Sequence, residues 1–352
     1  MKKLIYTLAV IVCAAAVVSC GNKANETGRI TKGKRSSMDT LSYYMGYVNS
    51  YGFKANLPDA KVDWDIAAKT CEESMLSTVE LINDENSKKA GETMQKFFGE
   101  TRIERLNKLN EEKGGGDSTK MNQELAFDLN EIDIFENEQE RKEISWAMGY
   151  DMGSNLRNMP FELQSYWFVK GLEDGIKLDS RLEFDKAQTF LHRYITLTWP
   201  VKNAEKSKEW LAEIEKQPNV KKHESGLLYR IDREGDANNK PTAQSTVKVD
   251  YEGNTRDGVI FDSSYKRGES IEFPLSGVIP GWTIGMQLVG KGGQITLWIP
   301  AELAYGPRGG GSIGPNEALE FKVELHDVKT KAQAEAEAAA AAEAQAQSAE
   351  EI

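Results

Sequence analysis

The sequence predicts an α+β protein in which an all-helical N-terminal region precedes an antiparallel sheet domain. Two observations carry this prediction. Up to about residue 216 the apolar residues recur three or four positions apart, as in amphipathic helices, and after residue 224 they alternate with polar residues, as in strands. A chain of 352 residues is long enough for two domains or three small ones.

The composition narrows the class of function before any motif is considered. Charged residues make up 28% of the chain and hydrophobic residues 39%, which is typical of a globular protein and not of an integral membrane bundle. The net charge of -11 gives no general attraction to nucleic acid. Three cysteines are too few for a disulfide-stapled scaffold and match no metal-site spacing.

The N-terminus has the pattern of an export signal. Two lysines precede an apolar run over residues 4–18, which is short for a transmembrane helix. The run ends at Val17-Val18-Ser19-Cys20-Gly21, which resembles a bacterial lipobox. We therefore expect a signal peptide over 1–19, which removes Cys13, and a lipid on Cys20 that anchors the protein stably to the membrane. The alternative is an ordinary signal peptide with a chance cysteine at this place.

The mature chain begins with a polar segment and then repeats itself. Residues 20–37 are polar and basic, which predicts a flexible lipidated tether. The segment Ser42-Tyr43-Tyr44-Met45-Gly46-Tyr47 is matched 103 residues later by Ser145-Trp146-Ala147-Met148-Gly149-Tyr150. Each copy continues with a turn near a proline, a Trp-containing segment and a third helical stretch. We expect two related helical units, over 38–113 and 121–200. Cys71 then remains as a small buried side chain.

The rest of the chain predicts an arm, a sheet domain and a tail. Residues 201–222 are rich in Glu and Lys at helical spacing, which predicts an exposed helical arm that Pro200 starts or interrupts. Residues 223–330 predict the sheet domain, with strands at 227–231, 246–251, 294–299 and 319–325. Residues 331–352 are rich in Ala, Glu and Gln and predict a solvated tail.

Hydrolytic and metal chemistry finds little support. His192, His223 and His326 lie in three separate segments, and none stands in a metal-binding motif. No G-x-S-x-G segment occurs, and the glycine-rich stretch 306–311 lacks the Lys-Ser/Thr of a phosphate loop. We expect neither a metal nor a cofactor.

The sheet domain contains four motifs, in order over about residues 224–328. They are Val247-x-Val249-x-Tyr251-x-Gly253, Asp257-Gly258-x-x-Phe261-Asp262-Ser263-Ser264-Tyr265, Val278-Ile279-Pro280-Gly281-Trp282 and Ala304-Tyr305-Gly306. Together these motifs resemble the FK506-binding-protein (FKBP) type of peptidyl-prolyl cis-trans isomerase. The helical region resembles the N-terminal dimerisation region of the periplasmic and macrophage-infectivity-potentiator-like members of that family.

The resemblance implies a half-barrel of antiparallel strands wrapped on a short helix that starts near Trp282 or Thr283, with an apolar pocket between them. It places Trp282 at the pocket floor and Asp262 as the carboxylate at its edge. The other residues that it implies for the pocket are Tyr251, Phe261, Phe273, Val278, Ile279, Tyr305, Ile313 and Phe321. On the family pattern, the Ile279 N–H and the Tyr305 hydroxyl hold the peptide carbonyls that flank the proline.

Such a pocket suits a reaction that breaks no covalent bond. Prolyl isomerisation rotates an amide against a barrier of about 18 to 20 kcal/mol, and it needs no nucleophile. We therefore expect a peptidyl-prolyl cis-trans isomerase that acts on Xaa-Pro segments of unfolded or partly folded proteins and assists the folding of exported envelope proteins. The alternative is a non-catalytic chaperone or peptide-binding module that uses the same pocket.

Partners and location follow from the same features. We expect the protein to be lipid-anchored to the bacterial cell envelope, at the outer membrane facing the periplasm, with no other membrane contact and no nucleic acid. Two oligomeric states stay open. The helical region forms either a homodimer, as the resemblance implies, or an internally paired monomer, because both copies of the repeat lie on one chain.

Overall fold

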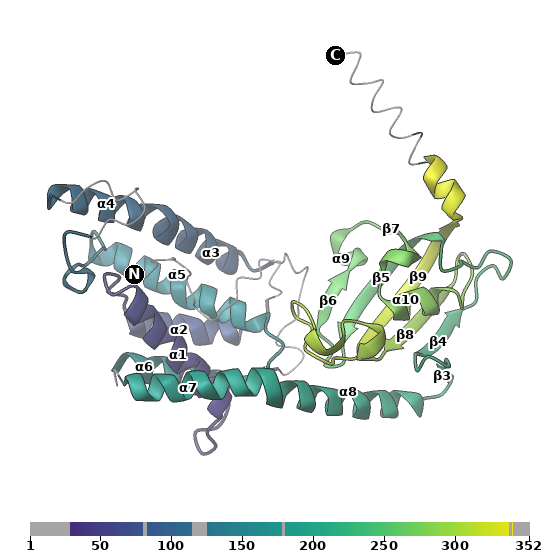
Figure 1. The fold of residues 1–352 in the computed structure, drawn as a ribbon, viewed down its shortest axis with the longest axis horizontal. Helices are drawn as coiled ribbons and strands as arrows, with labels where there is room; N and C mark the ends of the chain where they lie inside the picture. Colours follow the sequence, from purple (N-terminus) through teal and green to yellow (C-terminus); the bar gives the residue numbers. More distant parts are fainter. Residues whose placement is uncertain (1–28, 80–82, 115–124, 178–179, 338–339, 341–352) are drawn as a thin grey trace, which may run out of the picture. The chain divides into compact units, whose positions relative to one another are not determined.

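The computed structural model describes residues 29–79, 83–114, 125–177, 180–337 and 340 (Figure 1). These residues form two compact units, a helical one up to Thr196 and one from Leu197 onward that contains an antiparallel sheet. The expected α+β class is therefore confirmed. The predicted signal peptide, Cys20, the break at 115–120 and most of the predicted tail lie outside the described residues.

The first copy of the repeat forms three helical stretches, each of which begins directly after an aspartate. The side chains of Asp39, Asp63 and Asp84 accept hydrogen bonds from backbone N–H groups of the first turn, as N-capping residues do. The elements are α1 (Thr40–Asn56), α2 (Trp64–Met75), α3 (Glu85–Lys96), the π-helical segment η2 (Phe97–Thr101) and α4 (Arg102–Glu112).

The second copy repeats this order, including the π-helical segment after the third helix. A short 3-10 turn, η3 (Leu129–Glu131), precedes it. Its elements are α5 (Glu138–Arg157), α6 (Ser165–Lys177), α7 (Arg181–Arg193) and η4 (Tyr194–Thr198), which α8 (Trp199–Glu215) follows. Asn137 and Ser180 cap α5 and α7.

The two copies interleave within the helical unit. The first helix of each copy packs against the second helix of the other, so that α1 pairs with α6 and α5 pairs with α2. The glycine of each repeated Met-Gly-Tyr segment lies at this contact. A Cβ on Gly46 would lie 1.9 Å from the carbonyl oxygen of Phe168, and one on Gly149 would lie 2.1 Å from that of Ala67. The repeated glycines therefore let each helix pair approach backbone to backbone.

The structure shortens the tether that we expected over 20–37. Strand β1 (Ile30–Thr31) pairs in parallel with β2 (Leu163–Gln164), and Ile30 is buried. The indole N–H of Trp167 donates to the carbonyl of Ser37 at 2.7 Å. Residues 29–37 are thus held on the helical unit, in contrast to the flexible segment that their polar composition predicted.

The second unit is built on one antiparallel sheet with strand order β3-β4-β8-β9-β5-β6, and β7 also pairs with β5. The predicted strands form, and β3, β6 and β7 add to them. The bounds are β3 (Lys221–Lys222), β4 (Leu228–Arg233), β5 (Thr246–Thr255), β6 (Ile260–Ser263), β7 (Ile271–Pro274), β8 (Gln294–Ile299) and β9 (Leu319–Lys329). Two short helices, α9 (Ser264–Arg267) and α10 (Pro280–Met286), complete the unit, with the 3-10 turns η5 (Leu275–Gly277), η6 (Ala301–Leu303) and η7 (Gly306–Arg308).

Helix α8, which we expected as an exposed arm, packs on the sheet unit along one face. Its residues Trp210, Leu211 and Ile214 contact Leu228 and Trp298 of the sheet. Proline lies in its first turn, as expected for a helix start. The charged residues that suggested a fully exposed arm occupy only its other faces.

Cys71 is buried in α2, as expected, and burial raises the pKa of its thiol well above the ordinary value. The thiol therefore stays protonated at neutral pH, whereas the thiolate is the nucleophilic form. Among the helices of the described ranges, none is both long and apolar enough to cross a bilayer.

The backbone contact at Gly46 predicts different effects for two glycine substitutions on the same helix. Gly46→Ala places a methyl group against the α6 backbone. We therefore expect it to lower the free energy of unfolding of the helical unit by about 1 to 3 kcal/mol. Gly52→Ala is the matched control, because no atom lies within 4 Å of its added Cβ, and we expect it to be neutral or slightly stabilising. Urea unfolding followed by circular dichroism compares them. Equal unfolding midpoints would contradict the close helix packing.

Candidate active site

An aromatic cluster occupies the face of the sheet against which α10 packs. Trp282, on α10, is 4% exposed and lies at the centre of this cluster. The ring centroids of Tyr251, Phe321 and Phe273 lie 5.1, 5.3 and 5.4 Å from that of Trp282, with interplanar angles of 89°, 85° and 61°. Edge-to-face arrangements of this kind are favourable for aromatic rings. Four separate elements, β5, β7, β9 and α10, thus contribute to one apolar surface.

The position of Trp282 depends on how closely α10 lies against β8. A Cβ on Gly281 would lie 2.4 Å from Cγ2 of Ile299, and one on Gly285 would lie 2.5 Å from Cδ2 of Leu297. The Thr283 hydroxyl also donates to the carbonyl of Leu275 at 2.7 Å, which fixes the helix at its other side. Glycine at both positions lets the helix lie directly on the strand.

Sequence reasoning missed the role of Gly253, although this glycine belongs to the first quoted motif. On the β5–β9 ladder Gly253 pairs with Phe321, so both face the cluster. A Cβ on Gly253 would lie 2.7 Å from the Phe321 ring and 2.8 Å from the Phe261 ring. Because Gly253 has no side chain, these two rings can pack over its backbone, edge to face with centroids 5.5 Å apart.

The cluster has one polar edge, formed by Tyr251, Asp262 and Arg267. The Tyr251 hydroxyl and the Arg267 guanidinium both donate to the Asp262 carboxylate, and Arg267 also donates to the Tyr251 hydroxyl at 3.0 Å. Burial and the hydrogen bond to Asp262 raise the pKa of Tyr251, so its hydroxyl keeps its proton at neutral pH. Sequence reasoning missed Arg267; the signal was a basic residue five positions after the one expected carboxylate.

The remaining predicted residues complete the walls. Phe261, Val278 and Ile279 are partly buried against the cluster, and Ile313 is buried in it. Tyr305 lies between η6 and η7, and its side chain is 46% exposed. Burial and the charge of Asp262 raise the pKa of the Tyr305 hydroxyl. The structure therefore gathers nine of the ten predicted residues in or directly beside the cluster, and it leaves Tyr305 at the exposed rim within the field of Asp262.

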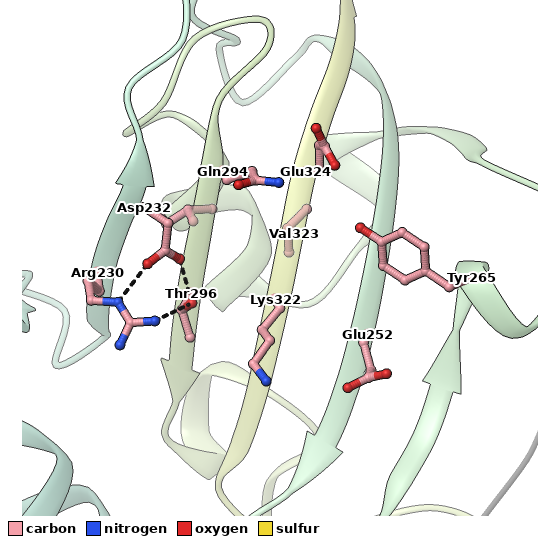
Figure 2. Close-up of a pocket in the computed structure, with 10 residues that line it drawn as sticks. Arg230, Asp232, Glu252, Tyr265, Gln294, Thr296, Lys322, Val323 and Glu324 are labelled. Atoms are coloured by element: carbon pink, nitrogen blue, oxygen red, sulfur yellow. Dashed lines mark hydrogen bonds and ion pairs between the residues drawn. The ribbon is translucent and has the colours of Figure 1, made fainter.

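A hollow of about 340 Å³ lies on the other face of the sheet (Figure 2). Its polar lining alternates along β4, β8 and β9 with the residues that face the aromatic cluster. Arg230 pairs with Asp232 at 2.6 Å, and Asp232 accepts from Thr296 at 2.7 Å. The lining residues are Arg230, Asp232, Glu252, Tyr265, Gln294, Ile295, Thr296, Lys322, Val323 and Glu324. None of the ten predicted residues lines this hollow, so the aromatic cluster, which gathers nine of them, remains the candidate site.

The described ranges contain no group of three or more His, Cys, Asp or Glu side chains placed to hold a metal ion. His326 instead lies with Nε2 2.7 Å from a carboxylate oxygen of Asp250, and His223 hydrogen-bonds to Ser225. Both are partners in local hydrogen bonds.

Comparison with known protein families gives two adjacent matches. Residues 237–326 match the model of the FKBP-type peptidyl-prolyl cis-trans isomerases. Residues 141–231 match the model of the domain that lies amino-terminal to such isomerases. The second match begins within α5 and contains the rest of the second copy of the repeat and all of α8.

Curated relatives agree with these matches. An FKBP-type peptidyl-prolyl cis-trans isomerase, FkpA of Aeromonas hydrophila, is 37% identical over 204 residues, which is 53% of this chain and 76% of the relative. The outer membrane protein MIP of Legionella longbeachae is 34% identical over 205 residues, 55% of this chain and 88% of the relative. Among solved structures, FkpA of Escherichia coli is 33% identical and aligns with 56% of this chain and 99% of its own, with a TM-score of 0.40.

Proposed function

The chain belongs to the FKBP-type peptidyl-prolyl cis-trans isomerases and is an enzyme of that class, and we propose that it isomerises Xaa-Pro bonds at the aromatic cluster around Trp282. The observation that carries this assignment is the packing of three rings edge to face against Trp282, which leaves its surroundings apolar. The substrates that we propose are unfolded or partly folded exported proteins, since uncatalysed isomerisation takes about 10 to 100 s and limits their folding.

The proposed mechanism uses the loss of amide resonance. A planar prolyl amide has a polar carbonyl, whereas the twisted amide at the top of the barrier is less polar. An apolar surface of rings therefore penalises the planar state more than the twisted state, which lowers the barrier between them. A reduction of about 5 to 6 kcal/mol would correspond to about four powers of ten in rate. No nucleophile and no proton transfer are needed.

Hydrogen bonds at the rim orient the peptide in this proposal. The backbone N–H of Ile279, at the start of α10, and the hydroxyl of Tyr305 donate to the carbonyls that flank the proline. Asp262 holds the Tyr251 hydroxyl by accepting a hydrogen bond from it, and Arg267 balances the carboxylate charge. The pocket edge therefore carries no unbalanced negative charge that would face the substrate carbonyl.

Removal of the pocket floor tests the proposed mechanism. We expect Trp282→Ala to lower kcat/KM for an Xaa-Pro peptide at least about tenfold, because the proline ring loses its principal contact. Peptide exchange measured by two-dimensional NMR gives the rate. Because loss of a buried Trp also costs about 3 to 5 kcal/mol of stability, Tyr305→Phe provides a second variant, which removes only one hydroxyl from a half-exposed residue. We expect it to lower the rate severalfold without changing the unfolding midpoint.

The same assay separates catalysis from binding alone. Exchange at the uncatalysed rate in the presence of the intact protein would refute the mechanism, and peptide binding without exchange would support the non-catalytic binding module instead.

We further propose that the protein is exported and anchored to the bacterial envelope through a lipid on Cys20. The support is the sequence up to Cys20, together with the name of the Legionella longbeachae relative as an outer membrane protein. We expect Cys20→Ala to move the protein from the membrane fraction to the soluble fraction after cell lysis. Cys13→Ala is the matched control, because it changes a cysteine within the predicted signal peptide. Membrane association of Cys20→Ala would refute the anchor.

We also propose that the helical unit is an internally paired monomer and not half of a homodimer. The support is the reciprocal packing of α1 with α6 and of α2 with α5, which uses the first two helices of both copies within one chain. Light scattering of the chain without residues 1–20 tests this, and we expect the mass of a single chain. A mass of twice the chain would refute the internal pairing.

A further inference from the structure

The loop that covers one side of the aromatic cluster is tied to α8. We call residues 304–318, between η6 and β9, the flap. The side-chain amide of Asn203 on α8 donates to the carbonyl oxygen of Pro315 at 2.7 Å. The hydroxyl of Ser207, one turn further along α8, accepts from the backbone N–H of Ala318 at 3.0 Å. Asn203 and Ser207 are 3% and 5% exposed, so these bonds are made away from solvent.

The flap contributes matching contacts from its own side. The Asn316 side chain donates to the carbonyl of Pro200 at 3.1 Å, and its backbone has a φ of 55°, in the left-handed region that Asn tolerates. The buried Glu317 carboxylate accepts from the N–H of Gly314 at 2.5 Å. Arg256 lies 3.8 Å from that carboxylate and also donates to the Ser207 hydroxyl at 3.3 Å. One polar network therefore joins α8, the flap and β5–β6.

This network fixes the residue that reaches the cluster. Ile313 precedes Gly314 and is buried in the same cluster as Trp282. Gly310 and Ile313 exchange two backbone hydrogen bonds of 2.9 and 3.0 Å, which make a short loop of this part of the flap. Residues 309–311 are all glycine, so their own backbone conformation is weakly restricted. Besides its two hydrogen bonds with Gly310, Ile313 is therefore held from its C-terminal side, where Pro315 and Ala318 bond to α8.

We propose that Asn203 and Ser207 are positioning residues for isomerisation, which hold the flap so that Ile313 covers the proline ring on Trp282. This role rests on the proposed function and extends it to residues outside the sheet. Loss of the Asn203 amide leaves the buried Pro315 carbonyl without its donor, and the flap then moves to reach water. Helix α8 is in this view a part of the catalytic unit as well as the connection to it.

Activity measurements on the chain without residues 1–20 test the role. Asn203→Leu keeps a similar volume but donates no hydrogen bond, and we expect it to lower kcat for an Xaa-Pro peptide about tenfold, with KM changed less than about threefold. Ser207→Ala should have a smaller effect in the same direction. Lys208→Ala is the matched control, because Lys208 is exposed on α8, and we expect it to match the wild type.

A double-mutant cycle shows whether Asn203 acts through Ile313. We expect Ile313→Ala to lower kcat. We expect Asn203→Leu to cause little further loss of kcat in the Ile313→Ala variant, because the side chain that the flap positions is already absent there. Additive losses would overturn the role, because they would mean that Asn203 affects catalysis by another route, such as general stability.

Amide hydrogen exchange gives a readout that does not depend on activity. We expect Asn203→Leu to speed the exchange of the amides over 310–318, and Lys208→Ala to leave it unchanged. Unchanged exchange together with unchanged kcat in Asn203→Leu would overturn the inference. A wild-type protein without isomerase activity would instead refute the proposed function itself, and the exchange data would then decide whether α8 holds the flap.

Discussion

Trp282 reaches the centre of the aromatic cluster because α10 lies directly on β8, and the other walls of the site are arranged around that contact. Gly281 and Gly285 leave no side chain between the helix and Ile299 or Leu297. Interiors of proteins are packed as densely as organic crystals, so a larger residue at either glycine would shift the helix and not merely fill a gap. The edge-to-face contacts of Trp282 with Tyr251 and Phe321 would then be lost together.

The polar edge of the site is arranged to keep its interior apolar. A carboxylate beside an aromatic pocket would favour the planar, polar state of a bound amide if its charge were unbalanced. Asp262 instead accepts from both Tyr251 and Arg267, and the guanidinium lies 5.5 Å over the Tyr251 ring. The three groups form a closed local network, which fixes the Tyr251 ring as a wall while its charges cancel.

Sequence reasoning predicted the parts of the fold that depend on periodicity and on ordered motifs, and it failed where a contact is polar or very short. The alternating strands and the ring residues were predictable because each face of a strand repeats every second residue. The attachment of α8 to the flap was not, because Asn203 and Ser207, which make that contact, are polar and carry no periodic apolar signal. Strand β1 contains only two residues, of which Ile30 alone is apolar. The space at Gly253 depends on rings from β6 and β9, which no local pattern reveals.

The interleaved repeat has a consequence for how the helical unit responds to dilution. In a two-chain assembly the contact between Gly46 and the partner helix would form and break with protein concentration. Here α1 and α6 belong to the same chain, so their contact is intramolecular and its formation does not depend on protein concentration. The helical scaffold of the proposed monomer therefore stays assembled at any protein concentration, and it carries one catalytic domain by covalent connection.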